Sequence, residues 1–366
     1  MSLGRKSLFC AFILVIALGG SALSVKATIR FAYVANFSSN NISGYTLDAS
    51  TGAMTAVAGS PFSVRPPTGS GPTQVTIDAG GTFALVSNFN SNNVSVFQIN
   101  RSTGVLTEVA GSPFAAGNGP MSVAIDAFTT YVYVANGNDN AVSAYIINAR
   151  TGALTPALGT LAASTFATGL GPVSVTLDPG GQFVYTTNFF DGTVNAFVLN
   201  PNTGGLSSRT TAAAGSCPDA IVVESSGKFA YVVNNCDSTI SAYSINGSTG
   251  ALTEINLPRT KTGNAPGLLT PDGGGKSLYV ANYLDNNVSG YLISGTGALT
   301  PISGTPMATG NGPVGVAIGT FDAFLYVTNS IDNTVTRYTR STSTGMLSSI
   351  GTTGAGTYAY FIATSN

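Results

Sequence analysis

Short apolar runs recur along the chain at a nearly constant distance, separated by polar segments. Seven of these runs share a six-residue pattern, and six of the seven begin with an aromatic residue; all end on asparagine, with starts at Phe31, Phe83, Tyr131, Phe183, Phe229, Ser277 and Phe324. Successive starts lie 46 to 52 residues apart. Repeats of this length that hold several short strands are typical of propeller blades.

Each repeat predicts four β-strands, illustrated by residues 171–178, 183–188, 193–200 and, after a Thr-Gly turn, 153–158. Valine, isoleucine, tyrosine, phenylalanine and threonine dominate these segments, and glycine, asparagine, aspartate and proline separate them. No long stretch with a 3.6-residue period follows the N-terminus. We therefore expect very little helix.

The order of the segments at the two ends predicts a closed ring. The first repeat begins at its second strand, Phe31, and the last repeat is followed by an additional first-type strand at 357–364. That strand can complete the first blade, which removes exposed sheet edges. We expect residues 28–366 to form a monomeric, all-β, seven-bladed β-propeller with four antiparallel strands per blade.

The N-terminus has the pattern of a secretory signal peptide. Arg5 and Lys6 precede an apolar run at 8–18, and small residues follow, with cleavage expected after Ala27 or Ala22. An uncleaved anchor is the alternative, although this run is shorter than the roughly 20 residues that span a bilayer. We expect an exported protein, in the periplasm, at the cell surface or outside the cell.

The charge of the chain argues against a nucleic-acid partner. Removal of residues 1–27 takes three of the 14 basic residues and none of the 15 acidic ones, which leaves a net charge of −4. A nucleic-acid-binding protein needs a basic patch.

Two cysteines remain after removal of the leader, and they flank a predicted hairpin. If Glu224 pairs with Phe229, Cys217 lies opposite Cys236, close enough for a disulfide. An exported protein favours such a bond. Two free thiols are expected instead if the register differs.

Polar residues that recur in every repeat are expected to have structural roles. Asparagine ends the second strand of all seven repeats, at Asn36, Asn88, Asn136, Asn188, Asn234, Asn282 and Asn329. Five aspartates share a position before the third strand: Asp139, Asp191, Asp237, Asp285 and Asp332. Residues needed in so many blades are expected to bond the backbone of turns. A cation held by the aspartate ring is the alternative, but Ca²⁺ takes about six to eight oxygen ligands and each blade supplies one carboxylate.

Aromatic residues follow the repeated asparagine in four blades, at Phe37, Phe89, Phe189 and Tyr283. Packing over the blade core is the expected role, and an outward surface that stacks on sugars or a partner is the alternative.

One residue departs from its repeat in a way that indicates a binding site. Asp219 begins a first strand, and the first strands of a propeller line the central channel. The equivalent residues of other repeats are uncharged: Thr73, Met121 and Val173. Arg65, Arg259 and Lys261 lie in long loops that should open on the same face. An acid among bases at a channel mouth is a candidate ligand site, and a carboxylate in a solvated loop is the alternative.

The repeats resemble the seven-bladed propeller lactonase family, which includes 6-phosphogluconolactonase-like hydrolases and carboxymuconate cyclases. They are also similar to YVTN-repeat proteins, through Tyr-Val-Thr-Asn at 326–329. Residues 217–243 resemble the family pattern GPRHxxFHPxGxxxYVxNExxSTVxxY. The arginine, histidine and glutamate on which the family's proposed catalysis relies are replaced by Asp219, Ala220 and Asn235, and Cys217 replaces a glycine.

The sequence contains no histidine, which excludes Ser-His-Asp and Cys-His nucleophiles and histidine-rich metal sites. Our leading hypothesis is a scaffold, without a cofactor, that binds a small molecule, glycan or protein on the propeller face. The alternative is a lactone hydrolase in which Asp219 is the base and Arg65, Arg259 or Lys261 stabilises the oxyanion. In both hypotheses Asn235 is a further candidate ligand contact.

Overall fold

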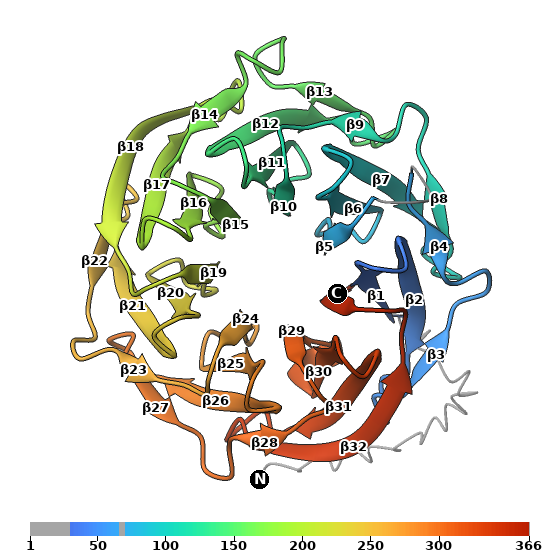
Figure 1. The fold of residues 1–366 in the computed structure, drawn as a ribbon, viewed down its shortest axis with the longest axis vertical. Helices are drawn as coiled ribbons and strands as arrows, with labels where there is room; N and C mark the ends of the chain where they lie inside the picture. The colour runs from blue at the N-terminus through green and yellow to red at the C-terminus, as the bar shows by residue number, and fades with distance from the viewer. Residues whose placement is uncertain (1–29, 66–69, 366) are drawn as a thin grey trace, which may run out of the picture.

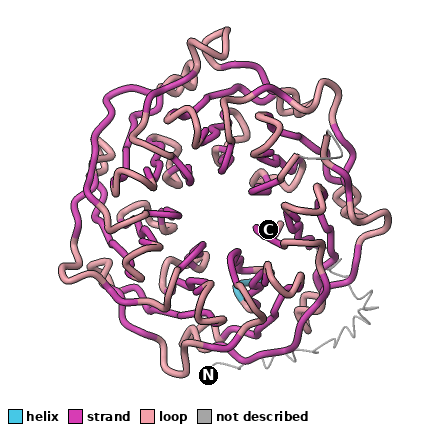
Figure 2. The backbone as a smooth tube through the Cα atoms, in the orientation of Figure 1, coloured by secondary structure: helices cyan, strands magenta, loops and turns pink. Residues whose placement is uncertain are grey.

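The computed structural model of the chain describes residues 30–65 and 70–365. Seven blades, each built on four antiparallel strands, form a ring whose innermost strands surround a central channel (Figure 1). Strands and short loops make up nearly all of the described chain (Figure 2), and its one helical segment is the 3-10 turn η1 (Thr320–Asp322). The predicted seven-bladed β-propeller is confirmed.

The two inner strands of each blade contain the most apolar segments of the repeat. The innermost strands are β5 (Pro72–Ile77), β10 (Pro120–Ile125), β15 (Pro172–Leu177), β19 (Pro218–Val223), β24 (Pro266–Pro271), β29 (Pro313–Ile318) and β33 (Ala359–Thr364). The second strands are β1 (Arg30–Asn36), β6 (Phe83–Asn88), β11 (Tyr131–Asn136), β16 (Phe183–Asn188), β20 (Phe229–Asn234), β25 (Ser277–Asn282) and β30 (Phe324–Asn329). Neighbouring blades cover both faces of each second strand, which is why its sequence is almost continuously apolar.

The two outer positions are less regular. The third strands are β2 (Asn41–Leu47), β7 (Asn93–Ile99), β12 (Ala141–Ile147), β17 (Thr193–Leu199), β21 (Thr239–Ile245), β26 (Asn287–Ile293) and β31 (Thr334–Arg340). The outer strands are β3 (Met54–Ala56), β8 (Leu106–Glu108), β13 (Leu154–Pro156), β18 (Leu206–Ala213), β22 (Leu252–Glu254), β27 (Leu299–Pro301) and β32 (Leu347–Gly354). In five blades a second short strand also pairs with the third: β4 (Phe62–Ser63), β9 (Phe114–Ala115), β14 (Thr165–Ala167), β23 (Thr260–Lys261) and β28 (Met307–Ala308).

The repeated aromatics and the Thr-Gly turns pack against each other across blade boundaries. Tyr33 is fully buried, and its hydroxyl donates to the carbonyl of Gly104 in the next blade at 2.7 Å. Gly104 has a φ of +75°, and a Cβ there would lie 2.4 Å from the ring of Phe31. Only glycine accommodates both conditions, which explains why the aromatic run and the glycine turn recur together.

The ring closes through the last strand of the chain. β33 pairs antiparallel with β1, with Ala32 opposite Thr364. Beyond the ladder, the backbone N–H of Phe31 donates to Ser365 Oγ at 2.9 Å, and the N–H of Ser365 donates to the carbonyl of Phe31 at 2.8 Å. The closure predicted from the order of the segments is confirmed.

The repeated asparagines hold the turns of their blades, as expected. Asn188 is fully buried and donates through Nδ2 to Thr193 Oγ1 at 2.9 Å and to Asn195 Oδ1 at 3.0 Å. Its Oδ1 accepts the N–H of Gly169 at 3.2 Å, in the loop that leads to the innermost strand. One side chain thus connects three segments of one blade.

A buried ion pair joins the last two blades. The third strand ends on an apolar residue in six blades but on Arg340 in the seventh. The guanidinium of Arg340 donates to the carboxylate of Asp272, to Tyr279 Oη at 2.9 Å and to the carbonyl of Asp322 at 2.7 Å. The side chains of Arg340 and Asp272 are only 2% and 4% exposed, so this pair is almost completely desolvated.

The predicted signal peptide, residues 1–27, lies outside the described residues. In the part of the chain that the structure describes, no helix has both the length and the apolar character needed to cross a membrane.

Candidate functional site

A β-bulge in each innermost strand places one residue at the mouth of the central channel. In β19 the pairing with β20 shifts between Pro218 and Ala220, so that Asp219 has no partner in the ladder. A register shift occurs at the same place in the other six innermost strands, and in β24 and β29 it leaves two residues outside the ladder. The residues at the equivalent positions are Thr73, Met121, Val173, Asp219, Gly267, Val314 and Tyr360. We call them the mouth ring, and the face to which they belong the top face.

Part of the mouth ring lines a pocket. The cavity has a volume of about 350 Å³ and is bordered by Phe37, Ser38, Thr73, Phe89, Met121, Tyr358 and Tyr360. The rings of Tyr358 and Tyr360 stack, with centroids 6.0 Å apart and planes inclined by 16°. Phe37 meets Tyr358 edge to face at 6.1 Å. Four aromatic side chains from the first two blades therefore surround a small, mainly apolar cavity, which we call the mouth pocket.

Of the four aromatic residues that the sequence singled out, two line this pocket and two do not. Phe37 and Phe89 belong to it. Phe189 instead packs edge to face on Phe190, with centroids 5.4 Å apart. Tyr283 interacts with Tyr358: burial chiefly raises the pKa of Tyr358, and the neighbouring Tyr283 raises it further.

The sequence pattern did not point to Tyr358 or Tyr360. Tyr360 lies in the last strand, β33, and Tyr358 lies directly before it. A comparison of the repeats could have indicated Tyr358, because it occupies a position with positive φ that four other blades fill with glycine. Tyr358 has a φ of +56°, and a bulky residue in that conformation often marks a functional or strained site.

Asp219 places a carboxylate at the mouth of the central channel. Among the residues of the seven innermost strands, all of which the structure describes, Asp219 alone is charged. Burial raises its pKa to about 7. The pKa of Tyr360 is also raised, first by burial and then by the charge of Asp219, so the two side chains are close enough to influence each other across the channel mouth.

The structure does not bring the three predicted basic residues to Asp219. Arg65 pairs with Glu108 of the outer strand β8 at 2.9 Å, and Arg259 pairs with Glu254 of β22 at 2.7 Å. Lys261 lies in the short strand β23, which also runs along the outside of its blade. The short strands β4 and β23, next to or containing these residues, pair with the third strand and so add to the outer part of each blade. The expected group of an acid among bases is therefore absent from the channel mouth.

Asn235 has a structural role between two blades. Its Nδ2 donates to the carbonyl of Pro266, in the neighbouring blade, at 3.0 Å. Its backbone N–H donates to the carbonyl of Cys217 at 2.9 Å. This contact fixes the start of two adjacent innermost strands.

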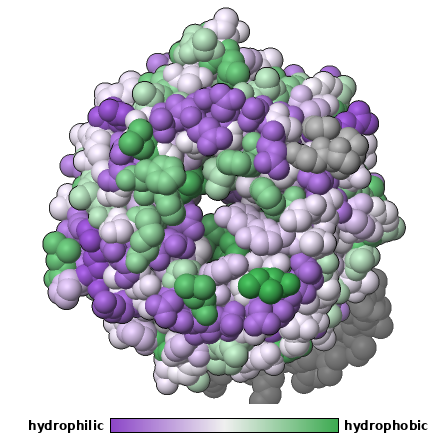
Figure 3. Space-filling view, in the orientation of Figure 1, coloured by the Kyte–Doolittle hydropathy of each residue, from purple (hydrophilic) through white to green (hydrophobic). Residues whose placement is uncertain are grey.

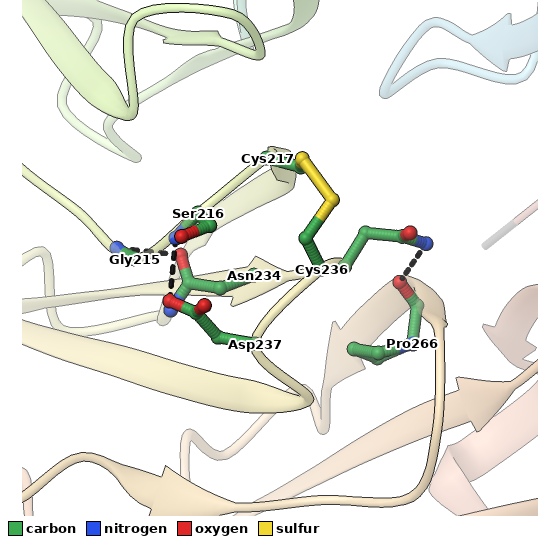
Figure 4. The surroundings of a disulfide bond; sticks show 8 residues. Gly215, Ser216, Cys217, Asn234, Cys236, Asp237 and Pro266 are labelled. Carbon is green, nitrogen blue, oxygen red and sulfur yellow. Dashed lines mark hydrogen bonds between the residues drawn. A yellow bond between two sulfur atoms is a disulfide. The ribbon is translucent and has the colours of Figure 1, made fainter.

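Cys217 and Cys236 are joined by a disulfide, with Cα atoms 5.4 Å apart (Figure 4). The expected register holds from Ala220 onward, but the bulge at Asp219 shifts it, so that Cys217 lies beside Asn235 rather than opposite Cys236. Cys217 also adopts a positive φ of +56°. The disulfide connects the loop before β19 to the loop after β20. Cys217 lies two residues before Asp219 in the chain.

The five top-face aspartates act as acceptors for loop backbone. Each carboxylate accepts an N–H from the loop before the innermost strand of its blade: Asp139 from Asn118, Asp191 from Leu170, Asp237 from Ser216, Asp285 from Asn264 and Asp332 from Asn311. These N–H bonds lower the pKa of Asp237, Asp285 and Asp332. Within 30–65 and 70–365, no three side chains of the metal-binding types are grouped closely enough to hold an ion.

The raised pKa of Asp219 leads to a test of its environment. Asp219→Asn is expected to raise the free energy of unfolding at pH 8 by about 1–3 kcal/mol and to leave it unchanged at pH 3. The carboxyl titrates near 3.8 when unfolded and near 7 when folded, so the folded state binds more protons between these values and loses stability as the pH rises through them. One pKa unit corresponds to about 1.4 kcal/mol, and partial exposure to channel water reduces the full effect. Urea unfolding of both proteins at pH 3, 5 and 8 measures it, and a difference independent of pH would contradict the assignment.

The sequence matches the family described as "Lactonase, 7-bladed beta-propeller" over residues 17–118, 112–203 and 175–362. The chain belongs to the seven-bladed β-propeller lactonase family. No curated protein matches its sequence.

Solved structures share this lactonase-family fold at low sequence identity. A candidate 6-phosphogluconolactonase from Bacteroides fragilis superposes with a TM-score of 0.80 at 20% identity, covering 94% of this chain and 99% of the other. The periplasmic gluconolactonase of Pseudomonas aeruginosa has a TM-score of 0.76 at 16% identity, covering 92% and 99%. A protein from Lactobacillus plantarum has a TM-score of 0.76 at 22% identity, with the same coverage. At these identities the likeness shows the fold alone.

The site of this lactonase-family chain departs from the family pattern in its chemistry. Where the pattern has arginine and histidine, Asp219 lies in the channel mouth and Ala220 is 4% exposed and packed into the core. Where the pattern has glutamate, Asn235 bonds the neighbouring blade. The innermost strands therefore bring one acid and no base to the channel mouth.

Proposed function

We propose that this protein is an exported propeller that binds a small ligand in the mouth pocket and does not use the usual catalysis of its family. The main support is the pocket itself. Its volume of about 350 Å³ lies near the lower end of the range for small-molecule sites, roughly 300–1,000 Å³. Four aromatic side chains offer stacking surfaces of the kind that bind the apolar face of a ring.

The replaced residues support binding rather than hydrolysis. Lactone hydrolysis needs a group that stabilises the developing oxyanion, and such a group commonly contributes about 3–4 kcal/mol. Arg65 and Arg259 are engaged by outer-strand glutamates, away from Asp219. A carboxylate without a nearby cation is poorly suited to stabilise negative charge.

Export of the protein is part of the same proposal. The N-terminal pattern of Arg5, Lys6 and the apolar run at 8–18 supports it, as does the disulfide between Cys217 and Cys236, which an oxidising compartment favours. The Pseudomonas aeruginosa protein of the same fold is periplasmic. We propose that the mature chain is a monomer, since ring closure pairs the strands that would otherwise be open edges.

Binding can be tested by calorimetric titration of purified residues 28–366 with neutral sugar lactones, free sugars and small organic cations. We expect at least one of these ligands to bind, and Tyr360→Ala to weaken that binding at least tenfold because it removes one wall of the pocket. The matched control is Phe189→Ala, which removes an aromatic residue of the same face that packs on Phe190 instead. Binding that survives Tyr360→Ala, or no binding at all, would refute the proposal.

Lactone hydrolysis remains the second candidate because the pKa of Asp219, about 7, suits a general base at neutral pH. In that reaction the Asp219 carboxylate would take a proton from the attacking water as the water oxygen adds to the lactone carbonyl carbon. The protonated Asp219 would then return that proton to the ring oxygen as the ring C–O bond breaks. We expect hydrolysis of 6-phosphogluconolactone and gluconolactone to proceed at the buffer rate. Turnover that Asp219→Asn abolishes would establish the hydrolase instead.

A further inference from the structure

We propose that the ligand of the mouth pocket carries a positive charge: an organic ammonium group, enclosed by the aromatic rings and balanced by Asp219. This inference rests on the proposed binding function and names the chemical class of its ligand. Three features of the channel mouth support it: the arrangement of the rings, the sign of the only charge on the seven innermost strands, all of which the structure describes, and the charges around the opening.

The rings provide a site of the type that binds quaternary and primary ammonium groups. Tyr358 and Tyr360 stack with centroids 6.0 Å apart, and Phe37 approaches Tyr358 edge to face. Phe89 lines the same cavity from the next blade, and Thr73 and Met121 complete it. A cation over such faces gains about 0.5–2 kcal/mol per ring, more as water is excluded.

The electrostatics of the channel fit a cation and not an anion. None of the described residues that line the mouth pocket is basic. Asp219 is the only charged residue of the innermost strands, and Tyr360, which lines the pocket, is close enough to be affected by its charge. The flanking positions of the mouth ring, Val173 and Gly267, supply no counter-ion. A phosphate or carboxylate ligand would therefore enter without a partner and face a like charge.

A half-buried carboxylate without a cation is itself unfavourable, and a cationic ligand would reduce that cost. Burial keeps the pKa of Asp219 high in the ligand-free protein. An opposite charge within about 4–6 Å favours the ionised form. The ligand would thus supply the positive charge that the fold does not.

Carboxylates around the opening of the channel also favour a cationic ligand. The hydrogen bonds from loop N–H groups lower the pKa values of Asp285 and Asp332, so these carboxylates stay ionised near neutral pH. The pKa of Asp237 is lowered by the same kind of bond and also by the nearby Arg259 and Lys261, so Asp237 adds little net negative charge. Each aspartate lies in a loop directly after a second strand, on the top face. Figure 3 shows a face of the ring that is hollowed at its centre, with hydrophilic and hydrophobic patches around the opening. Exposed carboxylates around a channel raise the local concentration of small cations.

The test compares two probes of the same shape and different charge, choline and its neutral carbon analogue 3,3-dimethylbutan-1-ol, by calorimetry with purified residues 28–366. We expect choline to bind at least tenfold more tightly than the alcohol. Asp219→Asn should reduce choline affinity at least tenfold and leave the alcohol unchanged. Tyr360→Ala should weaken both probes, and Phe189→Ala neither.

The outcomes separate this inference from the proposed function. Equal affinities for choline and the alcohol would overturn the inference and leave binding in the mouth pocket standing. The same conclusion would follow if gluconolactone bound, with sensitivity to Tyr360→Ala, and choline did not. Failure of every probe and sugar to bind would overturn both.

Discussion

Asp272→Ala is expected to lower the free energy of unfolding by about 4 kcal/mol, the largest effect that we predict for a single substitution. Arg340 would remain buried, with a side chain that is 2% exposed and no counter-charge. A guanidinium cannot escape this by losing its proton, and breaking a buried ion pair from one side costs about 3–5 kcal/mol. Denaturant unfolding of the mature chain measures the loss.

Two comparisons isolate the contribution of the ion pair. Asp126 holds the equivalent turn in another blade, where its carboxylate accepts the N–H groups of Thr130 and Tyr131 at 2.6 and 2.8 Å. Asp126→Ala should cost only about 1–2 kcal/mol, since it removes the turn contacts alone. Arg340→Leu, which restores the apolar residue found at this position in the other blades, should cost less, about 2 kcal/mol, because the Asp272 carboxylate keeps its hydrogen bonds from the turn N–H groups. Similar losses for Asp272→Ala and Asp126→Ala would show that the buried charge contributes nothing.

Replacing both bridged cysteines by alanine is expected to lower the free energy of unfolding by about 3 kcal/mol. The disulfide joins residues separated by 19 positions, and the loop-closure entropy of a loop of that size corresponds to about 3 kcal/mol. Unfolding curves of wild type and Cys217→Ala/Cys236→Ala measure the difference, and the wild type in a reducing buffer should follow the variant.

The repeat itself supplies the matched control. Other blades pair a glycine with asparagine at these two positions, as at Gly71 and Asn90, so Cys217→Gly/Cys236→Asn reproduces a natural arrangement without a bond. Glycine also relieves the positive φ of +56° at position 217, which costs about 1 kcal/mol for other residues. This variant should therefore lose about 2 kcal/mol. If it matched the wild type, local packing rather than the cross-link would account for the stability.

The fold could be predicted from the sequence because every blade repeats the same pattern of an apolar inner strand followed by a polar turn. The run at Phe83–Asn88 is apolar at nearly every position because it lies between two neighbouring blades, and its final asparagine is buried in a turn. Seven copies of that pattern determine strand order, turn positions and ring closure. Departures within the pattern, such as Asp219, could also be found by comparing the repeats with each other.

The candidate site could be predicted only in part, because distance from the channel axis is not visible in the pattern. Arg259 and Asp219 both lie near the top face, but the short strand β23 adds to the outside of its blade and keeps the arginine with Glu254. The mouth pocket combines Tyr360, at the end of the chain, with Phe37, near its start. This arrangement depends on the three-dimensional ring and on the bulges of three innermost strands, β5, β10 and β33, each of which shifts the register by one residue.

The pairing of β33 with β1 also constrains the order in which the protein can fold. Ala32 meets Thr364 in the same ladder, so the first blade stays incomplete until almost the whole chain is available. Until then β1 presents an unpaired edge, which is the part of a sheet most prone to wrong association. Closing so long a loop costs little more entropy than closing a short one, but contacts of such sequence separation form slowly. The innermost strand β33, which contains Tyr360 and directly follows Tyr358, is thus the last to join the ring, and ligand-binding competence should appear only in the final, ring-closing step of folding.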